Sequence, residues 1–82
     1  MSTTELIPSL RGRIDELDTQ IIALVEQRAH LSKQVQQQRI AGGGLRLELG
    51  REREILATYS GALGESGTAL ADAVLRTCRG AL

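Results

Sequence analysis

The arginines are the residues of this sequence whose spacing could serve the chemistry of a small anion. Arg28 and Arg39 lie eleven residues apart. On a helix that is about three turns, ~16 Å along the axis and within roughly 20° of the same direction. Ser32 and Val35 lie between them on the same side. Two long guanidinium side chains could bend across this gap and bracket a negatively charged ligand of sugar-ring size.

Arg28 occupies a position where burial of a charge would be costly. It follows Leu24 and precedes Leu31 in an apolar pattern with heptad spacing, which is typical of a helix that buries one stripe. A buried guanidinium without an anionic partner is strongly unfavourable. No carboxylate flanks Arg28 on that stripe. We therefore expect its partner to come from another helix, another chain or a ligand.

Arg11 lies too far from Arg28 for the two to hold one small ligand within a chain. Seventeen residues separate them, which on a helix is ~25 Å and about 100° of rotation. Arg11 of an antiparallel partner chain could reach the same site.

Both Arg11 and Arg39 also have simpler interpretations. Arg11 could form a solvated ion pair with Asp15, and Arg39 could interact favourably with the dipole of a helix C-terminus.

A second polar group follows the glycine-rich segment. Arg51, Glu52 and Ile55 lie three, four and seven residues after Glu48, so all four share one side of a helix. Glu48 and Arg51 could also form only a surface pair. The sequence has no metal-binding cluster, and Ser32 has no His or Asp partner for nucleophilic catalysis. An enzyme built on these residues would act by binding and electrostatics, without a cofactor.

The element that must position the first arginines is a helix predicted over residues 6–41. Its apolar stripe is Leu6, Leu10, Ile14, Leu17, Ile21, Leu24, Leu31 and Val35. Such a helix is ~50 Å long, whereas a compact chain of this size is about 30 Å across. The far end would expose its apolar stripe to water. We therefore expect an all-α fold in which a second copy covers that stripe, as an intertwined helical homodimer.

Two shorter helices are expected to complete a single domain over residues 1–82. The glycines at 42–44 end the first helix. A second helix over about 48–60 has an apolar face of Ile55, Leu56 and Tyr59, and a loop covers residues 61–67. A third helix over about 68–79 is capped by Ser66 or Thr68. Its predicted apolar stripe is Leu70, Ala73, Val74 and Thr77.

Composition excludes several classes of function. Ten acidic and ten basic residues give a formal net charge of zero, which argues against a nucleic-acid-binding protein. The single cysteine, Cys78, excludes an intrachain disulfide and a cysteine-based zinc site. It is expected to be a partly buried thiol in a reducing cytoplasm. The N-terminal segment has no signal-peptide pattern, and no stretch is long and apolar enough to span a membrane.

Residues 10–56 resemble the all-helical chorismate mutases, most closely the short stand-alone type of actinobacteria. The resemblance is carried by LRGRIDELDTQIIALVEQRAHLSKQV, by a basic residue at 39, and by GREREIL after a glycine turn. It implies a homodimer of three-helix chains with two shared active sites. It also implies the Claisen rearrangement of chorismate to prephenate in the shikimate pathway to phenylalanine and tyrosine.

The resemblance also implies roles for individual residues. Arg28 and the partner's Arg11 would hold the two substrate carboxylates, and Arg39 would face the ether oxygen. Glu48 and Glu52 would meet the ring hydroxyl. Arg51 would complete the cationic wall, and Thr77 falls near the position of a serine that lies close to a carboxylate. The implied catalytic residues are Arg28, Arg39 and Glu52.

Two residues depart from the family pattern, and the second of them predicts a mutase that is weak when alone. Position 48 is Glu where Asp is common, and Ala81 falls where many members have a Gln that donates to the ether oxygen. One such donor is worth about 10²- to 10³-fold in rate. Some short members are activated by DAHP synthase, and the C-terminus of this chain could be the element that responds.

Two other functions fit the same pattern. An isochorismate pyruvate lyase or an aminodeoxychorismate mutase would use the same arginine clamp. A non-catalytic helical dimerisation or regulatory module would use Arg28 only to set the register of the helices.

Overall fold

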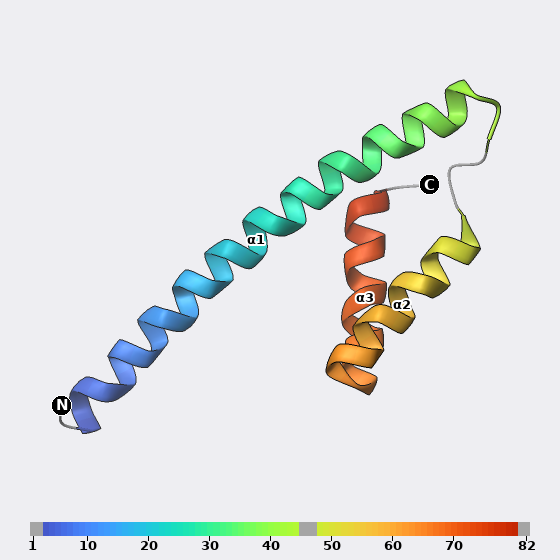
Figure 1. Ribbon diagram of the computed structural model, residues 1–82. Coiled ribbons are helices and arrows are strands. Elements are labelled where there is room, and N and C mark those ends of the chain that lie inside the picture. Colours follow the sequence, from blue (N-terminus) through green and yellow to red (C-terminus); the bar gives the residue numbers. More distant parts are fainter. Residues whose placement is uncertain (1–2, 45–47, 81–82) are drawn as a thin grey trace.

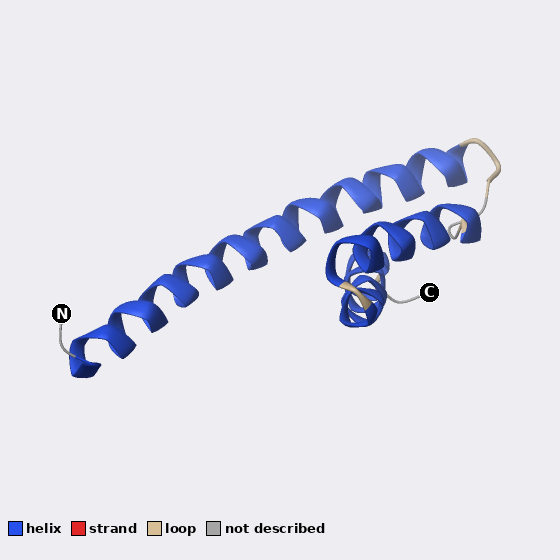
Figure 2. Ribbon diagram, turned by 60° about the horizontal axis from the view of Figure 1, so that its bottom comes forward, coloured by secondary structure: helices blue, strands red, loops and turns tan. Residues whose placement is uncertain are grey.

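The computed structural model describes residues 3–44 and 48–80, and these form three helices. α1 spans Thr3–Ala41, α2 spans Leu49–Leu63 and α3 spans Glu65–Arg79 (Figure 1). Figure 2 shows the same arrangement from another side, with α2 and α3 beside the C-terminal half of α1. The prediction of an all-α chain with one very long N-terminal helix is confirmed.

α1 determines the shape of the molecule. It begins at Thr3, earlier than predicted, and includes Pro8. It ends where Gly43 adopts a φ of 84° and the Gly44 N–H donates to the Arg39 carbonyl at 2.7 Å. The chain measures 61 × 24 × 17 Å with a radius of gyration of 17.2 Å, whereas a compact domain of this length has about 12 Å. α1 therefore extends well beyond the part of the chain that packs around it.

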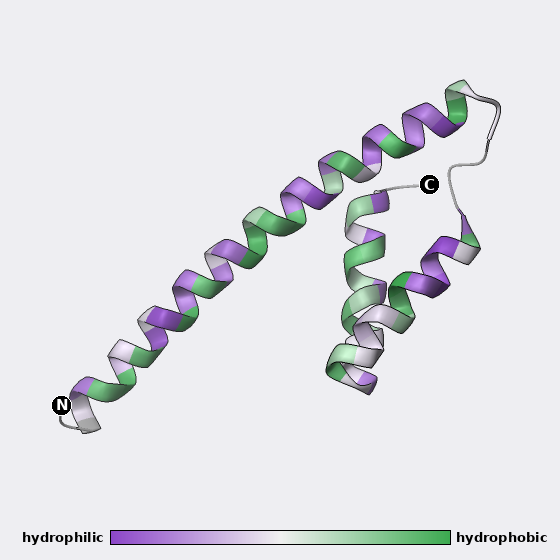
Figure 3. Ribbon diagram, viewed as in Figure 1, coloured by the Kyte–Doolittle hydropathy of each residue, from purple (hydrophilic) through white to green (hydrophobic). Residues whose placement is uncertain are grey.

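The apolar stripe of α1 is exposed along its whole length. Ile14 and Leu24 are 54% and 62% exposed, although their spacing is that of a buried stripe. Green apolar bands recur along α1 in Figure 3, including the half that α2 and α3 do not reach. Among the described residues, only Ala71 and Cys78 are fully buried hydrophobic side chains. Most of the surface that this sequence is patterned to bury is therefore unburied in one chain.

α2 and α3 form a hairpin with a one-residue connection. Gly64, with a φ of 76°, ends α2 and serves as the N-cap position of α3, and its N–H donates to the Ser60 carbonyl. The predicted loop over 61–67 is therefore wrong, because one glycine in the left-handed region suffices to end a helix. Ser66 and Thr68 lie inside α3, so neither is its cap.

The buried face of α3 also differs from the predicted stripe. Gly67, Ala71 and Cys78 are buried, whereas Leu70, Ala73 and Thr77 are exposed. Small residues occupy the contact because α3 packs closely against both other helices. By contrast, Ile55, Leu56 and Tyr59 of α2 are half-buried as expected. Across the residues that the structure describes, no helix combines the length and apolar character needed to cross a membrane.

Gly67 lies where α2 and α3 approach each other closely. A Cβ there would lie 2.3 Å from the carbonyl oxygen of Tyr59. We predict that Gly67→Ala lowers the free energy of unfolding by about 2–3 kcal/mol, because the backbone of α2 must move. Urea unfolding at fixed protein concentration measures this.

Gly61→Ala is the matched control for this substitution. Gly61 is helical, and a Cβ there would meet nothing within 4 Å. This control should raise the free energy of unfolding by up to about 1 kcal/mol. Equal effects of the two substitutions would contradict the close packing of α2 and α3.

Candidate functional site

A cleft of about 260 Å³ opens between the C-terminal half of α1, the start of α2 and the end of α3. Its polar lining is mostly charged, and its apolar lining is aliphatic. The lining residues are Arg28, Leu31, Ser32, Val35, Gln36, Arg39, Glu48, Arg51, Glu52, Ile55, Leu75 and Arg79. The predicted polar groups of the first and second helices therefore come together in one place.

Arg28 and Arg39 face the same cleft from α1, as their spacing predicted. Ser32 and Val35 line the wall between them. Arg28 is half-buried, and no residue within 3–44 or 48–80 forms an ion pair with it. That its partner comes from another chain or from a ligand therefore stays a prediction. An unpaired, half-buried guanidinium is a strong attractor for an anion.

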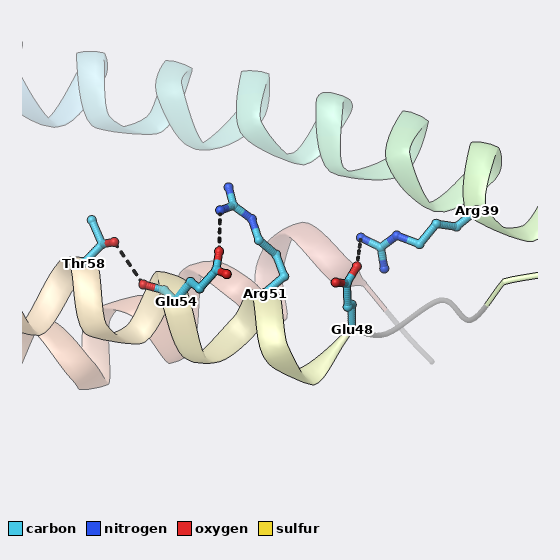
Figure 4. A network of polar contacts seen from close by, with 5 residues as sticks. All are labelled: Arg39, Glu48, Arg51, Glu54 and Thr58. Carbon is cyan, nitrogen blue, oxygen red and sulfur yellow. Dashed lines mark hydrogen bonds and ion pairs between the residues drawn. The ribbon is translucent and has the colours of Figure 1, made fainter.

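Arg39 and Glu48 face each other across the opening between α1 and α2. The Arg39 Nη2 lies 3.9 Å from the Glu48 Oε2, and Figure 4 shows the two side chains pointing toward one another. The Arg39 side chain is 30% exposed and that of Glu48 is 62% exposed. A contact this long and this exposed is weak. Arg39 therefore remains available to a ligand.

Arg51 projects from α2 toward α1 (Figure 4). Its Nη1 donates to Glu54 Oε2 at 3.2 Å. The suggested surface pair between Glu48 and Arg51 is therefore wrong, because Glu54 on the next turn is the partner. Thr58 donates to the backbone carbonyl of Glu54. The Arg51 guanidinium lies at the rim of the cleft, and its Nη1 is held by Glu54.

Arg79 is a lining residue that the sequence analysis missed. It is the last residue of α3, and its Nη1 donates to Oε1 of Glu52. The two side chains are 18% and 23% exposed, so this is the best-protected ion pair in the described part of the chain. The family resemblance carried little information about the third helix. The only signal was a basic residue in its last turn.

Two predicted site residues lie elsewhere. Arg11 is near the far end of α1, well away from the cleft. Thr77 is exposed on α3, where its hydroxyl donates to the Ala73 carbonyl at 2.8 Å. Ala81 lies outside the residues that the structure describes. Within one chain, the cleft therefore lacks the contributions expected from Arg11 and Thr77.

The charges of the cleft suit a ligand with two negative groups. Four guanidinium groups against two carboxylates leave a formal charge of +2. No group of His, Cys, Asp and Glu side chains in the described residues could hold a metal ion. The arrangement can bind, orient and electrostatically stabilise a dianion.

Comparison with known proteins places this chain in a family. The model of the family described as chorismate mutase type II matches residues 10–79. The chain belongs to the type II chorismate mutases. This match extends the resemblance, which was specific over residues 10–56, through the third helix.

Relatives and a solved structure agree with this chorismate mutase family. The chain is 45% identical over 76 residues to an intracellular chorismate mutase of Mycolicibacterium smegmatis, covering 93% of this chain and 73% of the relative. It is 46% identical over 76 residues to intracellular chorismate mutases of Mycobacterium bovis and Mycobacterium tuberculosis, covering 93% of this chain and 71% of each.

The solved structure is a non-covalent complex of DAHP synthase and chorismate mutase from Corynebacterium glutamicum with bound transition state analog. One of its chains matches with a TM-score of 0.92 and 35% identity, and the match covers 98% of this chain and 96% of that one. The long α1 and the short α2–α3 hairpin are therefore shared with a solved protein.

The unpaired charge of Arg28 has a testable consequence for stability. We predict that Arg28→Leu leaves the free energy of unfolding unchanged or raises it by about 1 kcal/mol, because it replaces an unpaired cation on an apolar stripe. Chemical unfolding at fixed protein concentration measures the change. Lys33→Leu, on an exposed position of α1, controls for the added leucine. A loss above about 2 kcal/mol would mean that Arg28 has a structural partner.

Proposed function

We propose that this chorismate mutase converts chorismate to prephenate in the cleft between its three helices. The observation that carries the proposal is that the unpaired Arg28 and the weakly paired Arg39 line one cleft of formal charge +2. Chorismate is a dianion with two carboxylates, so its charge complements that of the cleft. The same reaction is the first step toward phenylalanine and tyrosine.

The reaction requires little from the protein beyond geometry and charge. The rearrangement is unimolecular and passes through a compact chair conformer. Cations that clamp both carboxylates restrict the substrate to that conformer, which lowers the entropic part of the barrier. We assign this clamp to Arg28 of one chain and Arg11 of its partner.

Arg39 is proposed to stabilise the transition state directly. Partial negative charge develops on the ether oxygen as the carbon–oxygen bond breaks. A guanidinium at that oxygen interacts more strongly with the transition state than with the ground state, and this difference raises the rate. The long contact with Glu48 supports this role, because Arg39 can exchange a weak partner for the substrate.

Glu48 and Glu52 are assigned to the ring hydroxyl, and Arg51 to the cationic wall. Both glutamates line the cleft, and an ionised carboxylate can accept a hydrogen bond from a hydroxyl. Arg51 lies at the rim with Glu54 as its counter-ion. No role in the cleft follows for Thr77, whose hydroxyl is engaged with its own helix.

A homodimer is proposed to complete the site. The exposed stripe of α1 runs from Leu6 to Val35, with side chains 43–62% exposed. Burying such a stripe against a second copy is favourable by roughly 25 cal/mol per Å². An antiparallel partner would bring its own Arg11 toward the cleft. The dimer would thus supply both the missing core and the missing cation.

A partner enzyme is proposed to activate the mutase. The solved neighbour is a complex of DAHP synthase and chorismate mutase, which supports the same pairing for this chain.

The relatives are described as intracellular, and we expect the same compartment here.

Mutase activity is tested by following chorismate absorbance at micromolar enzyme, with prephenate identified as the product. Arg28→Ala should lower kcat/KM by about 10²- to 10³-fold, because one carboxylate loses its cation. Lys33→Ala, on the exposed side of α1, should match the wild type. Release of pyruvate from isochorismate, with no prephenate from chorismate, would instead establish the lyase.

Activation is tested by adding DAHP synthase of the same organism to the same assay. We predict a rise in kcat/KM, because ordering of the cleft by a partner removes the cost of organising the arginines around the substrate. An unchanged kcat/KM at saturating synthase would refute activation while leaving the mutase activity itself intact.

A further inference from the structure

The ion pair between Arg79 and Glu52 joins the end of α3 to the first turn of α2. The two residues are 27 positions apart in the sequence, and both line the cleft. Each lies at the helix end that suits its charge, with Glu52 in the first turn of α2 and Arg79 in the last turn of α3. The pair is therefore favoured by both helix dipoles as well as by direct attraction.

The position of Glu52 matters because three other guanidinium groups line the same cleft. Arg28, Arg39 and Arg51 are all lining residues, and Arg28 has no ion-pair partner in the described parts of the chain. A freely rotating Glu52 carboxylate would be drawn to such a cation. It would then neutralise a positive charge that a dianionic ligand needs.

We propose that Arg79 is a positioning residue that holds the Glu52 carboxylate on the α3 side of the cleft. In that position Glu52 stays within the cleft but is kept from pairing with Arg28. The carboxylate remains free to accept a hydrogen bond from the ring hydroxyl with its second oxygen, since Arg79 engages Oε1. This inference rests on the proposed function, because it assigns Glu52 to the substrate's hydroxyl.

A double-mutant cycle separates positioning from direct contact. The variants are Arg79→Met, Glu52→Gln and the two combined. The readouts are kcat and KM for chorismate and Kd for a hydroxylated bicyclic dicarboxylate that mimics the transition state. Arg79→Met alone should raise KM and Kd about tenfold, because the freed Glu52 pairs with Arg28 and the hydroxyl contact is lost. In the Glu52→Gln background, the same substitution should change either constant less than about twofold.

Two further variants control for folding and for nonspecific loss of charge. Arg79→Lys keeps the charge and should recover most of the affinity. That recovery would show that the loss in Arg79→Met comes from the missing charge and not from misfolding. Arg76→Met removes an exposed arginine of the same helix, which pairs with Asp72 at 3.0 Å. It should leave KM and Kd at wild-type values.

Wild-type constants for Arg79→Met would overturn the proposal. An undiminished effect in the Glu52→Gln background would also overturn it, since Arg79 would then contact the ligand directly. A wild type that binds the analogue but does not convert chorismate would refute the proposed function alone, because the Kd values still decide the role of Arg79. A wild type that binds neither compound would refute both.

Discussion

The guanidinium of Arg28 lies on a helix stripe that is otherwise leucine, isoleucine and valine, and no described residue pairs with it. Other features of the cleft follow from the need to keep that charge available. Arg51 and Arg79 have their own carboxylate partners, Glu54 and Glu52. The remaining carboxylate, Glu48, contacts Arg39 only at long range. The ion pairs that are present leave Arg28 unpaired and Arg39 weakly paired, so both can bind a ligand.

The length of α1 suits the same constraint if the chain forms the proposed dimer. A site for a dianion needs cations on opposite sides of the ligand, and one straight helix presents Arg28 and Arg39 from one side only. A partner's Arg11 can approach from the other side if α1 extends far past its own α2–α3 hairpin. The structure has this extension, with apolar side chains exposed along it. In the proposed dimer, assembly and catalysis would use the same helix, because its apolar stripe would join the chains and its arginines would bind the substrate.

Sequence patterns predicted α1 and the charged side of α2, because helical spacing fixes which side chains share a face of one helix. That Arg28 and Arg39 would meet Glu48, Arg51 and Glu52 was implied only by the family resemblance. They failed at the α2–α3 hairpin. A loop of seven residues was expected from two glycines, but Gly64 alone makes the turn and Gly61 stays helical. The buried face of α3 was missed because Gly67, Ala71 and Cys78 are small, and the prediction followed the larger Leu70. Arg79 could not be found from periodicity, since its contact with Glu52 depends on how two helices pack.

The central claim is that each site takes Arg28 from one chain and Arg11 from the other. Mixing two variants, Arg11→Ala and Arg28→Ala, tests it directly after subunits have exchanged. Each variant alone should be nearly inactive. A heterodimer would contain one site with both arginines and one with neither, so an equal mixture should regain about a quarter of the wild-type activity. A mixture that stays inactive although heterodimers have formed would contradict the shared site, and two variants that are each fully active would contradict the clamp itself.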